Sequence, residues 1–133
     1  MSMEVYIVAV IIGDILSKIV NIVSIQRDFG NDQANIIKNI LRYIKSLKIR
    51  KYSIVVLHEL SLTKYFPITK ERKISKTIYS NIPHDIEVFV RLCQDKRIYL
   101  VLSLCEKTSI GNYFNSTVII SPCGKIIAKQ RKR

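Results

Sequence analysis

The sequence has few cysteines and few acidic residues, and it contains no long uncharged apolar run. Its 133 residues include three cysteines, Cys93, Cys105 and Cys123, without a CxxC spacing. This odd number at these spacings argues against a zinc site and against a disulfide framework, so we expect neither metal nor cofactor. Cys93 and Cys105 lie in apolar segments, where a cysteine is usually a small buried hydrophobe. A reducing, cytoplasmic setting fits this pattern.

The shortage of long apolar runs bears on membrane association. The longest uncharged stretch near the N-terminus, residues 5–13, is much shorter than the roughly 20 apolar residues that a membrane-spanning helix needs. Glu4, Asp14 and Lys18 interrupt the apolar sequence around it, and no basic segment precedes it as in a signal peptide. We therefore expect a soluble protein without a membrane partner.

The shortage of acidic residues leaves a strongly basic chain. There are 22 Lys and Arg residues against 10 Asp and Glu, which gives a formal net charge of +12. Such an excess favours polyanionic partners, although most of these basic residues are scattered over presumed helix surfaces and loops. One cluster without acids is found at the C-terminal tail, at Lys125, Lys129, Arg131, Lys132 and Arg133. Nucleic-acid binding is therefore a possible but secondary hypothesis.

Apolar residues make up 48% of the chain, which is ample for a buried core, and their spacing predicts both strands and helices. β-branched residues predict a strand at residues 19–25, and an unbroken apolar run predicts a buried strand at residues 54–57. Between them, apolar residues at three- and four-residue spacing predict an amphipathic helix, with Asn31 or Asp32 as its cap. The apolar positions of this helix are Ile37, Ile40, Leu41, Ile44 and Leu47.

The second half of the chain continues the alternation of helix and strand. Residues 60–82 predict a long loop with at most one helical turn, and Pro83 can open a second helix. The apolar stripe of that helix consists of Ile86, Phe89, Val90 and Cys93. Strands are predicted at residues 98–104, 114–121 and 125–129, and the turn at residues 122–124 should join the last two as a hairpin.

This order predicts an α/β fold in which a mixed sheet carries two main helices on one face. The other face of such a sheet would expose apolar residues to water. We therefore expect a partner chain, a C-terminal half or a second copy to cover it.

Three blocks of the sequence resemble the nitrilase superfamily of carbon–nitrogen hydrolases, in the order and spacing of that family. Residues 54–67 read IVVLHELSLTKYFP and resemble the segment in which a strand delivers a catalytic glutamate ahead of an LSLTGY-like loop. Residues 89–132 are similar to the family's helix, strand, asparagine-bearing hairpin and final Arg-Lys. Residues 22–36 are similar to the family's first strand and helix start, with Gln26 and Asn35 at the places of its glutamine and asparagine.

The resemblance implies half of a nitrilase-like αββα sandwich. Residues 19–133 would form a partial carbon–nitrogen hydrolase domain, and residues 1–18 would be an N-terminal extension, either an added element or a start codon assigned too far upstream. The family hydrolyses non-peptide C–N bonds with a glutamate, a lysine and a nucleophilic cysteine. Glu59 and Lys132 match the first two, as general base and as the cation that stabilises the oxyanion.

The family's cysteine lies on a later strand, beyond the lysine, and this chain ends one residue after Lys132. None of the cysteines present matches the strand-to-helix elbow of that nucleophile. The resemblance therefore implies a truncated or split enzyme that is inactive alone. A C-terminal half would complete it for a small amide or nitrile substrate, and self-association or a partner chain is expected.

The sequence departs from the family pattern at two positions. His58 stands where the family has proline before the glutamate, and Lys64 stands where its loop has glycine. A lysine at a position that glycine fills with positive φ would cost on the order of 1 kcal/mol.

Simpler interpretations remain open for each candidate residue. Glu59 could be an ion-paired carboxylate at a strand end, and Lys132 could be one charge in a solvated tail. Asn115 and Ser116, near the start of a hairpin strand, are expected to bond local backbone. Two other functions also stay open: a stand-alone basic module that binds nucleic acid or an acidic protein, and an enzyme of another class that uses Glu59 and His58.

Overall fold

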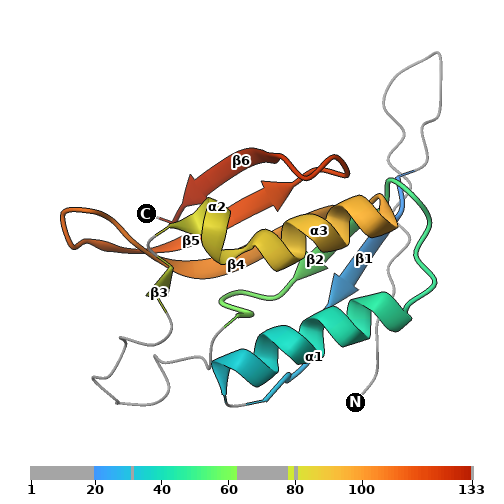
Figure 1. The fold of residues 1–133 in the computed structure, drawn as a ribbon, viewed down its shortest axis with the longest axis horizontal. Coiled ribbons are helices and arrows are strands. Elements are labelled where there is room, and N and C mark those ends of the chain that lie inside the picture. Colours follow the sequence, from blue (N-terminus) through green and yellow to red (C-terminus); the bar gives the residue numbers. More distant parts are fainter. Residues whose placement is uncertain (1–19, 31, 63–77, 80, 133) are drawn as a thin grey trace.

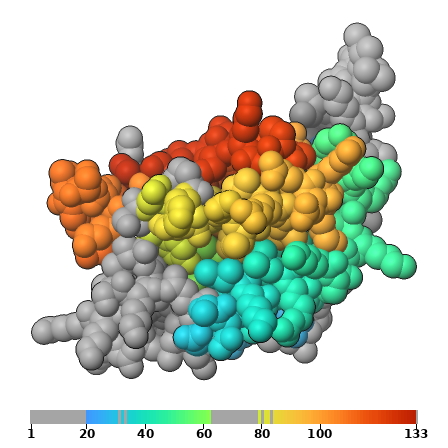
Figure 2. Space-filling model, in the orientation of Figure 1, coloured from blue at the N-terminus to red at the C-terminus, as the bar shows by residue number. Residues whose placement is uncertain are grey.

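The computed structural model describes residues 20–30, 32–62, 78–79 and 81–132, which form a mixed sheet with helices packed on one face (Figure 1). In chain order the elements are β1 (Ile22–Ile25), α1 (Gln33–Ser46), β2 (Ile54–Leu57), β3 (Ile78–Tyr79), α2 (Ile82–Asp85), α3 (Glu87–Lys96), β4 (Tyr99–Lys107), β5 (Tyr113–Ile120) and β6 (Ile126–Arg131). In the space-filling view α1 and α3 lie side by side over the sheet (Figure 2). The predicted α/β class with helices on one face is confirmed.

The strand order of the sheet is β1-β2-β4-β5-β6, and the short strand β3 pairs with β4 outside this path. β1, β2 and β4 are parallel, while β5 is antiparallel to both of its neighbours. β6 therefore runs in the same direction as β2 and β4. As a consequence, the carboxyl ends of β2, β4 and β6 meet at one edge of the sheet.

The core lies between the sheet and the helices. Ile36, Ile40 and Ile44, which recur every fourth residue along α1, are at most 2% exposed. Alternate residues of β4, such as Leu102, point to the same side and are fully buried. Because strand side chains alternate between faces, residues such as Val101 point to the opposite face, where they are only half-buried.

The start of α1 follows from its sequence. Asp32 is the N-cap residue, and its side chain accepts a hydrogen bond of 3.3 Å from the backbone N–H of Asn35. Such a bond satisfies one of the N–H groups left unpaired in the first turn. Of the two predicted caps, the structure therefore has Asp32, whereas Asn31 lies outside the described residues.

Three boundaries differ from the sequence prediction. The second helix is interrupted at Ile86, whose φ of −109° and ψ of 16° leave the helical region, so α2 and α3 are separate. β4 runs on to Lys107, because residues 105–107 still pair with β5. The predicted loop at residues 60–82 contains β3, although most of it, including Lys64, lies outside the described residues, as do residues 1–18.

The remaining strands agree with the prediction within a few residues. β2 has the predicted bounds, and β5 and β6 form the predicted hairpin around the turn at Gly124, whose φ is +81°. Within the described residues, no helix combines the length and hydropathy needed to cross a membrane.

Candidate active site

Glu59 and Lys132, which are far apart in the sequence, are in direct contact in the structure. Glu59 follows the end of β2 by two residues, and Lys132 comes directly after β6. Their contact is possible because both strands end at the same edge of the sheet. The Nζ of Lys132 donates to Oε1 of Glu59 at 2.9 Å, which is an ion pair. Lys132 is therefore ion-paired although its side chain is 69% exposed, and the same contact fits the simpler interpretation of Glu59 as an ion-paired carboxylate at a strand end.

Asn115 makes a second hydrogen bond to the same carboxylate oxygen of Glu59. Its Nδ2 donates to Oε1 of Glu59, while its Oδ1 accepts a 3.2 Å hydrogen bond from the hydroxyl of Ser103. Ser103 in turn accepts a 3.1 Å bond from the backbone N–H of Leu60. The sequence prediction that Asn115 bonds local backbone with its side chain is therefore wrong, since its side chain joins β5 to β4 and to the end of β2.

The backbone just after Glu59 is strained. Leu60 has a φ of +51°, in the left-handed region that a side chain disfavours by roughly 1 kcal/mol or more. The Leu60 side chain is 4% exposed, and the bond from its N–H to Ser103 holds the turn. Together the burial and the hydrogen bond maintain a conformation that directs Glu59 toward Asn115 and Lys132.

These residues line an open groove of about 680 Å³ on the sheet face opposite α1 and α3. Its floor is formed by β2, β4 and β5 through Val56, Val101 and Thr117. Glu59 and Lys132 lie at its wall, with side chains that are 45% and 69% exposed. The groove thus combines an apolar floor with one anionic and one cationic group.

The charge state of Glu59 follows from this environment. The hydrogen bond from Lys132, then the bond from Asn115 and the nearby ammonium charge, lower the pKa of the Glu59 carboxyl below its ordinary value. These contacts favour the ionised form because each places a donor or a positive charge on the carboxylate. At neutral pH Glu59 is therefore an anion, as a proton acceptor must be.

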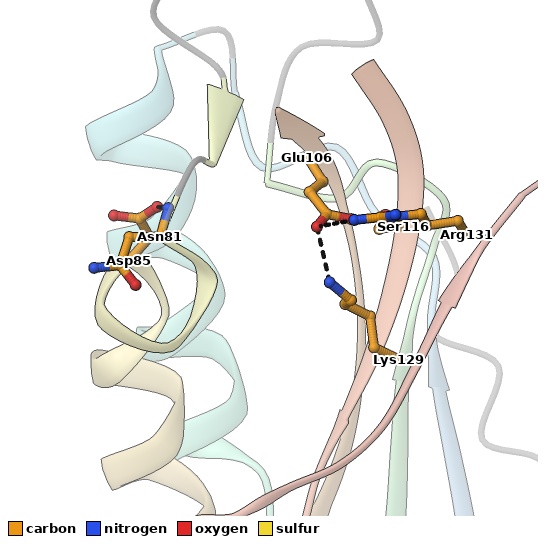
Figure 3. A network of polar contacts seen from close by, with 6 residues as sticks. All are labelled: Asn81, Asp85, Glu106, Ser116, Lys129 and Arg131. Carbon is orange, nitrogen blue, oxygen red and sulfur yellow. Dashed lines mark hydrogen bonds and ion pairs between the residues drawn. The ribbon is translucent and has the colours of Figure 1, made fainter. Parts of the chain in front are cut away.

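A second carboxylate, Glu106, lies near the end of β4 on the helix-covered face (Figure 3). It is 5% exposed, and it accepts bonds from Ser116 at 2.7 Å and from Lys129 at 2.8 Å. The guanidinium of Arg131 binds both of its oxygens, at 3.0 and 2.9 Å. Arg131 also stacks over the ring of Phe114 at 4.6 Å.

The Arg131 bonds, with help from Lys129 and Ser116, lower the pKa of Glu106 to about 2 despite its burial. This cluster was not predicted from the sequence, and the prediction that the Ser116 hydroxyl bonds local backbone is wrong, because it donates to Glu106. Glu106 lies beyond the strand predicted at residues 98–104, so that prediction placed it outside the sheet. Figure 3 also shows Asp85, whose carboxylate accepts a 2.9 Å bond from the Asn81 N–H at the start of α2.

The other candidate groups have environments that suit them less well for proton transfer or attack. His58 is half-buried beside the ring of Phe29, and desolvation lowers its pKa. Burial raises the pKa of the Cys93 thiol to about 12 and also raises that of Cys105. Cys123 is exposed, but it lies in the turn at the opposite end of β6 from Lys132. Thiols with raised pKa values are poor nucleophiles.

Among the described residues, the His, Cys, Asp and Glu side chains form no group of three that could hold a metal ion. Gln26 and Asn35 are both exposed. Neither lines the groove, which is formed by the end of β2 and by the strands β4, β5 and β6.

The family model named carbon-nitrogen hydrolase matches residues 20–133. Among solved structures, a carbon-nitrogen hydrolase from Helicobacter pylori G27 is similar at 26% identity, with a TM-score of 0.69 over 82% of this chain and 38% of that one. Saccharomyces cerevisiae Nit3, a member of branch 10 of the nitrilase superfamily, is 24% identical, with a TM-score of 0.61 over 77% of this chain and 40% of that one.

An N-terminal amidase has the same fold at 19% identity, with a TM-score of 0.64 over 84% of this chain and 27% of that one. The present chain therefore spans well under half the length of each of these three structures.

Proposed function

Because the chain belongs to the carbon–nitrogen hydrolase family, we propose that it supplies two of the three catalytic groups of a hydrolase for non-peptide C–N bonds. Glu59 is the general base and Lys132 is the cation that stabilises the oxyanion. A further polypeptide segment, in the same chain or another, supplies the nucleophilic cysteine. The observation that carries the proposal is the 2.9 Å contact between Glu59 and Lys132 in an open groove.

The two groups have complementary chemical roles. A carboxylate accepts the proton of a thiol as it attacks the carbonyl or nitrile carbon, and later returns it to the leaving nitrogen. An ammonium group beside it stabilises negative charge as this builds up on the tetrahedral intermediate. Placing both on one groove wall lets a single bound substrate face them together.

We propose that the thiol comes from outside the groove. Cys105 lies opposite Asn115 in the pairing of β4 with β5, but it is buried and its pKa is raised. Cys93 is buried on the core side of α3 and burial raises its pKa to about 12, so at neutral pH almost none of it is thiolate. Cys123 is separated from Lys132 by the whole length of β6, roughly 20 Å at about 3.3 Å per residue. We therefore propose that a covering segment brings the cysteine over the sheet.

The exposure of the groove supports this requirement. Its apolar floor is half-buried, whereas parallel strands are normally covered on both faces. A covering segment would exclude water from Glu59, and desolvation would raise its pKa from the present low value toward the range useful to a base near neutral pH. The proposed substrate is a small amide or nitrile bound between the two layers.

The first experiment is to sequence the coding DNA through and beyond the Arg133 codon, and to search the three forward frames for a strand-like segment that ends in cysteine. The chain extended by that segment is then assayed for ammonia release from a panel of short amides and nitriles. We expect turnover by the extended chain and none by the 133-residue chain.

Matched variants test the assigned roles in the extended chain. Glu59→Gln and Lys132→Met should each lower kcat/KM by about a thousandfold, an effect of roughly 4 kcal/mol on the barrier. Glu87→Gln is the control, because Glu87 is another exposed glutamate with a basic partner, Arg91, but lies on α3 away from the groove. Turnover by the 133-residue chain alone, or full activity of Glu59→Gln, would contradict the proposal.

A further inference from the structure

Glu106 and Lys132 lie on opposite faces of the sheet but are connected through β6. Along β6, Lys129 and Arg131 point to the helix-covered face, where both bind Glu106. Lys132 is the next residue, and alternation places its side chain on the groove face, where it binds Glu59. The position of the lysine therefore depends on how the end of β6 is held.

The backbone alone holds that end by few bonds. β6 is the last strand in the described sheet order and pairs with β5 on one side. The last bond is the 2.8 Å one from the Lys132 N–H to the carbonyl of Asn115. Strand ends held by few bonds fray readily.

We propose that Glu106 is a positioning residue that holds Lys132 against Glu59. Its carboxylate reaches from β4 across β5 to two alternate residues of β6, so it ties the last strand to the middle of the sheet. The two parallel hydrogen bonds from Arg131 fix the orientation of its side chain as well as its distance from Glu106, because the guanidinium group and the carboxylate lie in one plane. Rotation of β6 about its own axis would break this fork and withdraw Lys132 from the groove.

The residues around Glu106 support its proposed role in holding the end of β6. Glu106 is 5% exposed, and its partners are one neutral and two cationic donors, all from β5 and β6. Without the carboxylate, Lys129 and Arg131 would lie side by side as like charges on one face of β6. Both side chains are 41% exposed, so they would move apart into water.

The test is the pKa of the Glu59 carboxyl, measured by NMR through its side-chain 13C resonance in the intact chain. In Glu106→Gln this pKa should rise, because Lys132 leaves its contact with Glu59. The direct electrostatic effect has the opposite sign, since loss of a negative charge leaves more positive charge near Glu59 and favours its ionised form. A pKa that falls or stays unchanged in the folded variant would overturn the proposal.

If Glu106→Gln does not fold, the variant Arg131→Lys tests the same proposal. It keeps the charge of the cluster and removes the fork, so a smaller rise in the pKa of Glu59 is expected, and no rise would count against the proposal. Glu87→Gln should leave the pKa of Glu59 unchanged. Lys132→Met removes the ammonium group altogether, so it should give the largest rise in that pKa among these variants. The dispersion of amide peaks in the NMR spectrum of each variant shows whether the variant is folded, so displacement of Lys132 can be distinguished from unfolding.

The proposal rests on the proposed function only where it names Lys132 a catalytic group. The pKa measurement requires no turnover, so it can succeed even if the extended chain hydrolyses nothing. If instead the extended chain is active and Glu106→Gln leaves the Glu59 pKa unchanged, the positioning role fails while the proposed function stands.

Discussion

The buried carboxylate of Glu106 should make the folded chain sensitive to acid. Its pKa is lowered from an ordinary 4.5 to about 2, first by the hydrogen bonds from Arg131 and then by Lys129 and Ser116. A lowered pKa in the folded state means that the ionised form stabilises the fold. This contribution is complete above pH 4.5 and is lost as the pH falls toward 2.

The size of the effect follows from the same values. At 1.36 kcal/mol per pKa unit, the change corresponds to about 3 kcal/mol. Lys129 and Arg131 are each 41% exposed, so water screens part of the attraction, and about 2 kcal/mol is the more reasonable expectation. Glu106→Gln should lower the free energy of unfolding by this amount at pH 7.

Urea unfolding followed by circular dichroism measures the difference between the two proteins. Because glutamine does not titrate, the deficit of about 2 kcal/mol at pH 7 should shrink below pH 4.5, to roughly a quarter of that size by pH 2.5, and disappear only as the pH falls through about 2. A deficit that is equal at pH 7 and pH 2.5 would refute the electrostatic reasoning and point to packing. A deficit below about 0.5 kcal/mol at every pH would show that the ion pairs of Glu106 with Lys129 and Arg131 contribute as little as an ordinary surface salt bridge.

Three further outcomes test other parts of the structure. Cys123 is exposed, and its hydrogen bond with Ser121 lowers its pKa. A thiol reagent at pH 8 should therefore label Cys123 first, and the buried Cys93 and Cys105 only after denaturation. Mass spectrometry of the labelled peptides measures the order of labelling. Phe89→Ala, at a fully buried core position, should cost about 3 to 5 kcal/mol of unfolding free energy in the same urea assay. Gly124→Ala should cost about 1 kcal/mol or more, because φ is +81° and the added Cβ would lie 2.6 Å from the Gln94 side chain; an unchanged urea midpoint would contradict this.

Much of the fold could be predicted because its residues repeat at the period of their elements. The four-residue spacing of Ile40 and Ile44 is a helical pattern, and Asp32 is a typical cap for it. Ile36, which is buried with them, was not among the predicted apolar positions. The break at Ile86 could not be predicted, since the apolar stripe continues through it. β4 was predicted to end at residue 104, whereas it continues to Lys107, where the burial of Glu106 depends on cations from β6.

The candidate site could be predicted only in part. Resemblance to the family singled out Glu59 and Lys132, while Ser103 and the side-chain role of Asn115 were missed. These two residues acquire partners through the pairing of β4 with β5, in which Ser103 faces Thr117 and Cys105 faces Asn115. Cross-strand neighbours depend on register, and register is not apparent from one strand's own sequence.

The sequence by itself determined which residues are apolar, where the turns fall, and that a basic segment follows the last turn. Tertiary structure decided which of the closely spaced basic residues reaches the groove. The pairing of β5 with β6 shifts by one residue at Ile127, between the partners Ile126 and Ala128. Because side chains alternate, that one-residue shift places Arg131 on the helix-covered face and Lys132 beside Glu59.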